Sequence, residues 1–282
     1  MKPSLVIHIC LQMPIDPSES RIDLPKSQSW LVRGFCWYTR RLIRKHFWAF
    51  ACHALDAGPL STDAKRPIVF YCNHPGWWDP IVAMQISQHY FPDRVFYAPI
   101  DQLAIEKYSV FKKLGFFGIA LGNREGAATF LKQSHAVLKA PHAALWLTPE
   151  GRFADPRDKS ADWMPGLSHL LKKTPHAICI PVAIEYPFVD ESKPLMICKF
   201  GKALDGELLR ELSKSDGSVV LKNRLRETQQ ALCELIVARS FNDFKVLVRT
   251  AQKPESLYDF GRWIVCKLTF RQFELRHGKS FI

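Results

Sequence analysis

The sequence predicts an α/β fold: a single domain with a largely parallel sheet flanked by helices, preceded by an amphipathic interfacial helix. From Arg66 onward, short apolar runs with strand character alternate with segments of helical period, which is the pattern of a largely parallel sheet. The chain has 282 residues, of which 47% are hydrophobic, so it can bury one large core and is not wholly disordered. The segments on either side of this domain instead mix cations with aromatic side chains.

Residues 1–28 are predicted to form an irregular arm, and a helical pattern follows over residues 29–54. At about 100° per residue, one arc of this helix is apolar and the other is cationic, with Trp37 and Trp48 among the cations. The apolar arc holds Leu31, Val32, Phe35, Tyr38, Leu42, Ile43, Ala49 and Phe50, and the cationic arc holds Arg33, Arg40, Arg41, Arg44 and Lys45. A lipid headgroup region accommodates both the ring and the N–H of Trp, so we expect this helix to lie in a membrane interface. The alternative is an ordinary surface helix packed on the core.

The central part of the chain, residues 58–245, is expected to hold the α/β domain. Strands are predicted over residues 68–72, 94–98, 118–121, 143–147, 178–184 and 195–200. Helices are predicted over residues 80–90, 102–114, 125–138, 166–173 and 219–239. Residues 1–57 then form the arm and the interfacial helix, and residues 246–282 form a basic aromatic tail.

The net charge indicates a polyanionic partner. The 39 Lys and Arg residues exceed the 27 Asp and Glu residues, which leaves a formal charge of +12. Nucleic acid, a phosphate-bearing substrate and an anionic membrane surface are the three candidates. Much of this charge lies in residues 29–57 and 255–282, among Trp and Phe side chains, and no nucleic-acid-binding motif is present. We therefore expect the partner to be an anionic membrane and not nucleic acid. A basic nucleic-acid-binding protein is the least favoured alternative.

Cysteine usage and hydropathy point to the cytoplasmic side of a membrane. The eight Cys residues include no C-x-x-C pair, so we expect reduced, mostly buried thiols and no metal site. Residues 1–12 lack the features of a secretory signal. No uncharged apolar run reaches the ~18 residues of a transmembrane helix, so we expect a peripheral or monotopic protein.

The most informative motif is the stretch from Tyr71 to Pro80. It follows a predicted strand and precedes a predicted helix, so His74 lies at the carboxyl end of a strand, where open α/β sheets bind their ligands. Asp79 follows His74 by five residues, close enough in a turn for a hydrogen bond. A carboxylate that fixes the imidazole tautomer and stabilises the imidazolium makes the histidine a general base.

Three further stretches also lie at predicted strand ends or within strands. One supplies Glu150, Gly151 and Arg152 after the strand over residues 143–147. Another runs from Gly118 to Arg124, whose guanidinium can bind a phosphate through two parallel hydrogen bonds. The last, over residues 178–183, carries no chemical group and is interpreted as a scaffold strand or wall.

In this order, the four stretches resemble the sequence blocks of the glycerolipid acyltransferases, the family of 1-acylglycerol-3-phosphate acyltransferases. The first block (Asn-His-x4-Asp) corresponds to Asn73, His74 and Asp79. The second corresponds to Gly118 and Arg124, the third to Pro149, Glu150 and Gly151, and the fourth to Pro181. The resemblance covers roughly residues 60–200.

The resemblance implies the transfer of a fatty acyl group from acyl-CoA or acyl-carrier protein to a lipid hydroxyl. His74 would be the base and Asp79 its partner, and Arg124 would hold the acceptor's phosphate. Asn73, Gly118, Pro149, Glu150, Gly151 and Arg152 are expected at the substrate, and Pro181 in the wall of the site. The acyl thioester is a co-substrate, and no other cofactor is expected.

Three positions depart from the family's pattern, and all three are on the acceptor side. Gly76 replaces the usual Ser, Arg152 comes one position earlier than the family's Arg, and Pro165 replaces a basic residue before Gly166. We expect 1-acylglycerol-3-phosphate as the acceptor, and a glycosylated or isoprenoid lipid alcohol is the alternative. A hydrolase that uses the same His–Asp pair, with water as the acceptor, is also open.

Overall fold

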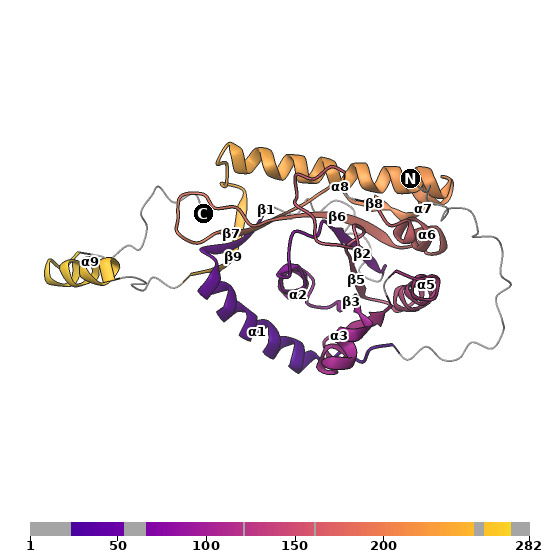
Figure 1. The fold of residues 1–282 in the computed structure, drawn as a ribbon, viewed down its shortest axis with the longest axis horizontal. Helices are drawn as coiled ribbons and strands as arrows, with labels where there is room; N and C mark the ends of the chain where they lie inside the picture. The colour runs from indigo at the N-terminus through magenta and orange to yellow at the C-terminus, as the bar shows by residue number, and fades with distance from the viewer. Residues whose placement is uncertain (1–23, 54–65, 121, 161, 251–256, 272–282) are drawn as a thin grey trace, which may run out of the picture.

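A nine-stranded sheet runs through the centre of the molecule (Figure 1). The computed structural model describes residues 24–53, 66–120, 122–160, 162–250 and 257–271. The strands are β1 (Ala49–His53), β2 (Ile68–Cys72), β3 (Val95–Asp101), β4 (Phe116–Ile119), β5 (Ala143–Leu147), β6 (Ile178–Glu185), β7 (Leu195–Phe200), β8 (Leu204–Asp205) and β9 (Phe244–Arg249). Their order across the sheet is β4-β3-β5-β2-β6-β7-β1-β9, and β8 pairs with β6.

The half of the sheet that contains β2 is parallel. Strands β4, β3, β5, β2 and β6 pair in parallel with their neighbours. Strand β7 is antiparallel to β6, β1 is parallel to β7, and β9 is antiparallel to β1. The predicted α/β fold with a largely parallel sheet is therefore confirmed.

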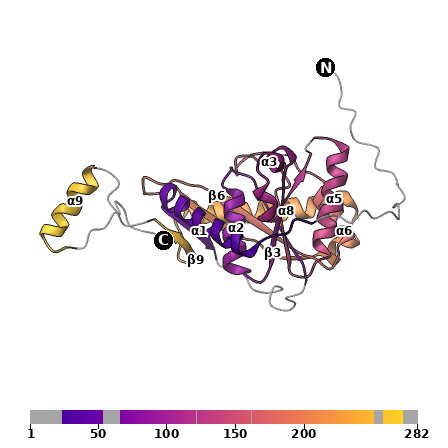
Figure 2. The same cartoon turned by 90° about the horizontal axis from the view of Figure 1, so that it is seen from below.

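Helices cover both faces of the sheet and give the fold its two main cores. The helices are α1 (Ser29–His46), α2 (Asp79–Tyr90), α3 (Gln102–Lys107), α4 (Val110–Lys113), α5 (Arg124–Leu138), α6 (Gly166–Lys173), α7 (Gly206–Arg210), α8 (Lys214–Val237) and α9 (Leu257–Leu268). Side chains of α1 and α2 pack into one core with one face of the sheet, and those of α5 to α8 pack into another. Figure 2 shows α1 and α2 side by side, and Figure 1 shows α8 on the opposite face. No helix within the described ranges is both long and apolar enough to cross a membrane.

Most predicted elements lie within a few residues of those observed, and two predictions were wrong. Residues 49–53 form β1 rather than the end of the first helix, because a strand paired on both sides and buried on both faces shows no alternation to distinguish it from a helix. Residues 102–114 form two short helices, α3 and α4, rather than one. Elements β8, β9, α7 and α9 were not predicted, and Leu121 lies outside the described residues.

Helix α1 packs on the core through one face. Cys36, Thr39 and Ile43 are its buried residues, and Leu31, Val32 and Phe35 pack against the same core. The side chains of Trp30 and Trp37 remain 66% and 59% exposed. Two assignments within the predicted arcs were wrong. Tyr38 is 52% exposed although it was placed on the apolar arc, and Trp48 follows the helix and is buried in the core rather than lying among the cations.

The sheet extends beyond the range predicted for the α/β domain. Strand β1 lies in the segment assigned to the arm and the interfacial helix, and β9 crosses the predicted boundary at residue 245. Both strands pair with each other, and β1 also pairs with β7. Most of the predicted arm over residues 1–28 lies outside the described residues, and the predicted tail is described only in part.

Candidate active site

The loop after β2 carries the central residues of the candidate site. Strand β2 ends at Cys72, between the parallel strands β5 and β6, and α2 begins at Asp79. The carboxyl ends of these parallel strands lie at one edge of the sheet, so the loops after β2, β5 and β6 meet there. His74 lies in the first of these loops, and its side chain is 20% exposed.

A short hydrogen bond joins His74 to Asp79. His74 Nδ1 lies 2.6 Å from Asp79 Oδ2, and the carboxylate is almost fully buried. The backbone N–H of Gly76 donates to the same oxygen at 3.1 Å, and the hydroxyl of Tyr186 donates to Oδ1. Because a carboxylate only accepts, Nδ1 of a neutral His74 carries the proton and Nε2 keeps its lone pair. The site thus holds a histidine prepared to accept a proton at Nε2.

The N-terminus of α2 favours the charge on Asp79. Asp79 is the first residue of α2, and Pro80 follows it in the first turn. The first N–H groups of a helix have no partner within the helix, and the helix dipole favours a negative charge there. A proline suits this position because it lacks an N–H and its φ already fits a helix. The local sequence therefore supports both the start of the helix and the position of the carboxylate.

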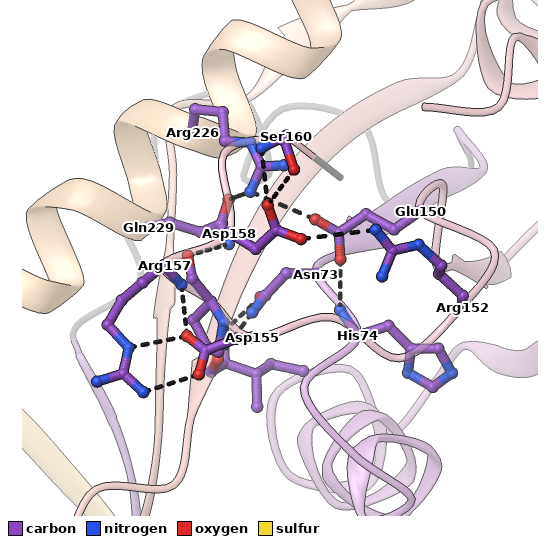
Figure 3. A network of polar contacts seen from close by, with 12 residues as sticks. Asn73, His74, Glu150, Arg152, Asp155, Arg157, Asp158, Ser160, Arg226 and Gln229 are labelled. Atoms are coloured by element: carbon purple, nitrogen blue, oxygen red, sulfur yellow. Dashed lines mark hydrogen bonds and ion pairs between the residues drawn. The ribbon is translucent and has the colours of Figure 1, made fainter. Parts of the chain in front are cut away.

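The loop after β5 holds the backbone of His74 on both sides, and Figure 3 shows the contact with Glu150. The carboxylate of Glu150 accepts the His74 N–H at 3.1 Å, and the His74 carbonyl accepts the Ala154 N–H at 3.0 Å. The ring of Phe153 lies 4.5 Å from the imidazole, centroid to centroid. Residues 150–154 therefore set the position of His74, while Asp79 sets the orientation of its ring.

Glu150 is a buried carboxylate with a cationic partner from a distant helix. Its side chain is 2% exposed, and its Oε1 lies 3.4 Å from Nη1 of Arg226 on α8. Arg226 also donates to Gln229, which in turn donates to the carbonyl of Pro156 (Figure 3). Burial raises the pKa of Glu150 above its ordinary value, while the His74 N–H and Arg226 oppose this shift.

The turn at Gly151 directs Glu150 toward His74. Gly151 has a φ of +64° and donates its N–H to the carbonyl of Thr148 at 3.0 Å. A Cβ at this position would also displace the end of the flexible Met164 side chain, but the positive φ is the main reason that a glycine fits here. The carbonyl of Pro149 accepts the Met164 N–H at 2.8 Å, which ties this turn to the segment before α6.

Arg152 and Asn73 both have partners within the protein. Nη2 of Arg152 lies 3.5 Å from the carboxylate of Asp158, and about half of the arginine side chain is exposed. Asn73 is fully buried, and its amide forms hydrogen bonds of 2.9 and 2.8 Å with the carbonyl and N–H of Ile184 on β6. These two bonds continue the pairing of β2 with β6 beyond Cys72, so Asn73 aligns the two loops.

Gly118 and Arg124 lie farther along the same edge of the sheet. A Cβ at Gly118 would lie 2.0 Å from the amide oxygen of Gln102, so this glycine allows a close approach. Asn123 caps α5 by accepting the Gly126 N–H, and the exposed Arg124 is the first residue of that helix. Strands β3 and β5 separate β4 from β2, so β4 itself lies roughly 14 Å to the side of β2.

Pro181 lies inside β6, opposite Tyr71 of β2. It is buried, and its carbonyl accepts the Gly201 N–H at 2.9 Å. Within the part of the chain that the structure describes, no group of three or more His, Cys, Asp or Glu residues is placed to hold a metal ion.

Residues 53–185 match the family model described as Acyltransferase. This stretch contains all four sequence blocks and the His74–Asp79 hydrogen bond. It is an acyltransferase domain. The comparison supports the resemblance to the glycerolipid and lysophospholipid acyltransferases, and with it a lipid acyltransferase. No curated protein matches the chain significantly.

Sequence reasoning missed four residues of the candidate site. Tyr186, Phe153 and Ala154 contact His74 or Asp79 directly, and Arg226 acts through Glu150. Tyr186 directly follows a strand of the sheet, and this position was a signal that could have identified it. Arg226 gave no such signal, because its segment showed only the spacing of a helix packed on the core.

Replacing Arg226 with Met is expected to destabilise the fold by about 3 kcal/mol near neutral pH, because it leaves a buried carboxylate without its ion-pair partner. The loss should shrink toward about pH 5. A carboxyl whose pKa is higher in the folded state stabilises the fold at low pH, and this contribution is lost as the pH rises through the folded value. Without Arg226 the pKa of Glu150 rises further, so the variant loses stability over a wider range of pH. Urea unfolding followed at about pH 5 and 8 measures both effects.

Arg224→Met is the matched control on the same helix. Arg224 pairs with Glu227 at 3.4 Å on the surface, where an ion pair contributes at most about 1 kcal/mol. We expect its loss to be small at both pH values. Equal, pH-independent losses for the two variants would contradict the role given to the Glu150–Arg226 pair.

Proposed function

We propose that the protein moves a fatty acyl group from acyl-CoA or acyl-carrier protein to the hydroxyl of a lipid acceptor, with 1-acylglycerol-3-phosphate as the acceptor. The observation that carries this proposal is the 2.6 Å hydrogen bond between His74 and the buried Asp79, inside an acyltransferase domain. A thioester carries a good leaving group of its own, so the side-chain group that the reaction chiefly needs is a base at the acceptor hydroxyl.

In this reaction His74 Nε2 takes the proton of the acceptor hydroxyl while the oxygen attacks the carbonyl carbon of the thioester. The carbon–sulfur bond then breaks, the ester forms, and the thiolate leaves. The proton on Nε2 passes to the thiolate, which gives a free thiol and restores the neutral histidine. Asp79 stabilises the imidazolium between these steps through the hydrogen bond at Nδ1.

A phosphate on the acceptor would find two cationic side chains at this edge of the sheet. Arg124 is exposed at the start of α5, and Arg152 is half exposed beside Glu150. Arg152 already pairs with Asp158, so a phosphate there must compete with a carboxylate. Because Asp158 competes for Arg152 and the apolar ring of Phe153 lies against His74, a different lipid alcohol is the alternative acceptor. With water as the acceptor, the protein would be a hydrolase.

We further propose that the acyltransferase works as a peripheral or monotopic protein on the cytoplasmic side of an anionic membrane. The exposed face of α1 combines Trp30 and Trp37 with Arg33 and Arg41. The guanidinium of Arg41 lies 3.4 Å from the centroid of the Trp37 ring. Aromatic rings beside cations suit a headgroup region that carries negative charge, and α9 presents a similar mixture.

His74→Ala should lower kcat/KM for acyl transfer by about 10³-fold, because it removes the base. Asp79→Asn should lower it by about 10²-fold or more, since the amide does not stabilise the imidazolium. The assay follows labelled acyl-CoA and acyl-carrier protein with 1-acylglycerol-3-phosphate, with other lipid alcohols and with water alone. Its products distinguish the acceptors from one another and from hydrolysis.

His89→Gln serves as the control, because His89 is an exposed histidine in the last turn of α2, at the end of the helix away from Asp79. It should turn over at the rate of the parent protein. Full activity of His74→Ala would contradict the assignment of the base. A parent protein that acylates no acceptor would contradict the proposed function itself.

Changing both Trp30 and Trp37 to Ser should weaken binding to phosphatidylglycerol vesicles by about tenfold or more. These substitutions leave the buried face of α1 and strand β1 intact, unlike a deletion of the N-terminal segment. Flotation with phosphatidylglycerol and with phosphatidylcholine vesicles measures the binding and its dependence on charge. Leu208→Ser, which changes an exposed apolar side chain on α7, is the control. Unchanged flotation of the double variant would show that α1 is not the docking face.

A further inference from the structure

Tyr186 makes a contact with the catalytic pair that the family's four blocks do not include. It lies directly after β6 and one residue beyond the stretch that matches the family model. Its hydroxyl donates a hydrogen bond to Oδ1 of Asp79. The other two donors to this carboxylate, His74 Nδ1 and the Gly76 N–H, both use Oδ2.

The division of donors between the two oxygens fixes the plane of the carboxylate. Asp79 is 2% exposed, so an oxygen without a protein donor would have little access to water. A partial rotation about the last side-chain bond of Asp79 would turn both oxygens away from their donors and break the bond to His74. The Tyr186 hydroxyl opposes that rotation from the side away from the histidine, and in this way it holds Oδ2 toward Nδ1.

The protein holds Tyr186 firmly in this position. Strand β6 pairs in parallel with β2, and Asn73 joins the ends of the two strands through Ile184, two residues before Tyr186. Pro187 follows, and a residue before proline is restricted to an extended backbone. The ring lies 5.6 Å from that of Phe47, centroid to centroid.

The tyrosine remains a hydrogen-bond donor at all physiological pH values. Burial, and then the neighbouring charge of Asp79, raise the pKa of Tyr186 well above its usual range. The phenol therefore keeps its proton and does not act as a base that competes with His74.

From this geometry we infer that Tyr186 is a positioning residue for the acyl transfer: it orients the Asp79 carboxylate that in turn orients His74. Its hydroxyl contacts Asp79, so Tyr186 acts on His74 through that carboxylate. The expected fall in kcat rests on the proposed function. The orientation of the Asp79 carboxylate rests on the hydrogen bond alone.

Tyr186→Phe keeps the ring and removes only the hydroxyl. We expect kcat to fall about tenfold while KM for the thioester and for the acceptor stays within about twofold of the parent value, because the defect concerns proton transfer rather than binding. Tyr71→Phe is the matched control. Its hydroxyl is also buried, but among the described residues it has no hydrogen-bond partner, so kcat should not change. Equal kcat values for the parent and Tyr186→Phe would overturn the inference.

A second measurement separates this inference from the proposed function. In protein labelled with ¹⁵N-histidine, the Nδ1–H proton of His74 is identified by its loss in His74→Ala, and its chemical shift reports the bond to Asp79. We expect this resonance to move in Tyr186→Phe and to stay in place in Tyr71→Phe. An unmoved resonance would overturn the role of Tyr186 even in an active enzyme. A parent protein without acyl transfer would overturn the proposed function, and the shift would still decide whether Tyr186 orients the pair.

Discussion

The buried negative charge of Asp79 constrains the whole neighbourhood of the candidate site. A carboxylate this far from water is stable only with several donors, and it has one each from His74, Gly76 and Tyr186. These donors come from the loop after β2 and from the end of β6, while the N-terminus of α2 adds its dipole. Groups from the loop after β2, from the end of β6 and from the start of α2 therefore all stabilise one charge.

A second buried carboxylate acts on the same histidine from the other side. Asp79 contacts the ring of His74, whereas Glu150 accepts its backbone N–H, and the Ala154 N–H holds its carbonyl. The position and the orientation of the base are thus set by separate groups. Burial raises the pKa of Glu150, and a distant cation, Arg226, offsets part of the hydration that this carboxylate loses.

Local patterns predicted the part of the site that is local in sequence. His74 and Asp79 are five residues apart, and the strand, turn and helix around them carry clear apolar and proline signals, so their pairing could be foreseen. The bonds of Glu150 to the His74 N–H and of Asn73 to Ile184 could not, because these partners are far apart in sequence and meet only when the strands pair. The contacts of Tyr186 and Arg226 depend on which strands and helices become neighbours in the fold. The spacing of hydrophobic residues along the chain does not encode that. The same limit explains β1, whose four fully buried residues carry no alternation.

The matched stretch alone would not complete this site. Tyr186 follows residue 185, Arg226 belongs to α8, and Phe47, which packs on Tyr186, precedes residue 53. The core on the α8 face also needs Leu221 and Leu225, which are almost fully buried against side chains of β2, β5 and β6. Removing α8 would expose that apolar face and leave Glu150 without its cation. The acyltransferase domain therefore supplies the hydrogen-bonded pair of His74 and Asp79, and the segments around it supply the burial and the partners that hold this pair in place.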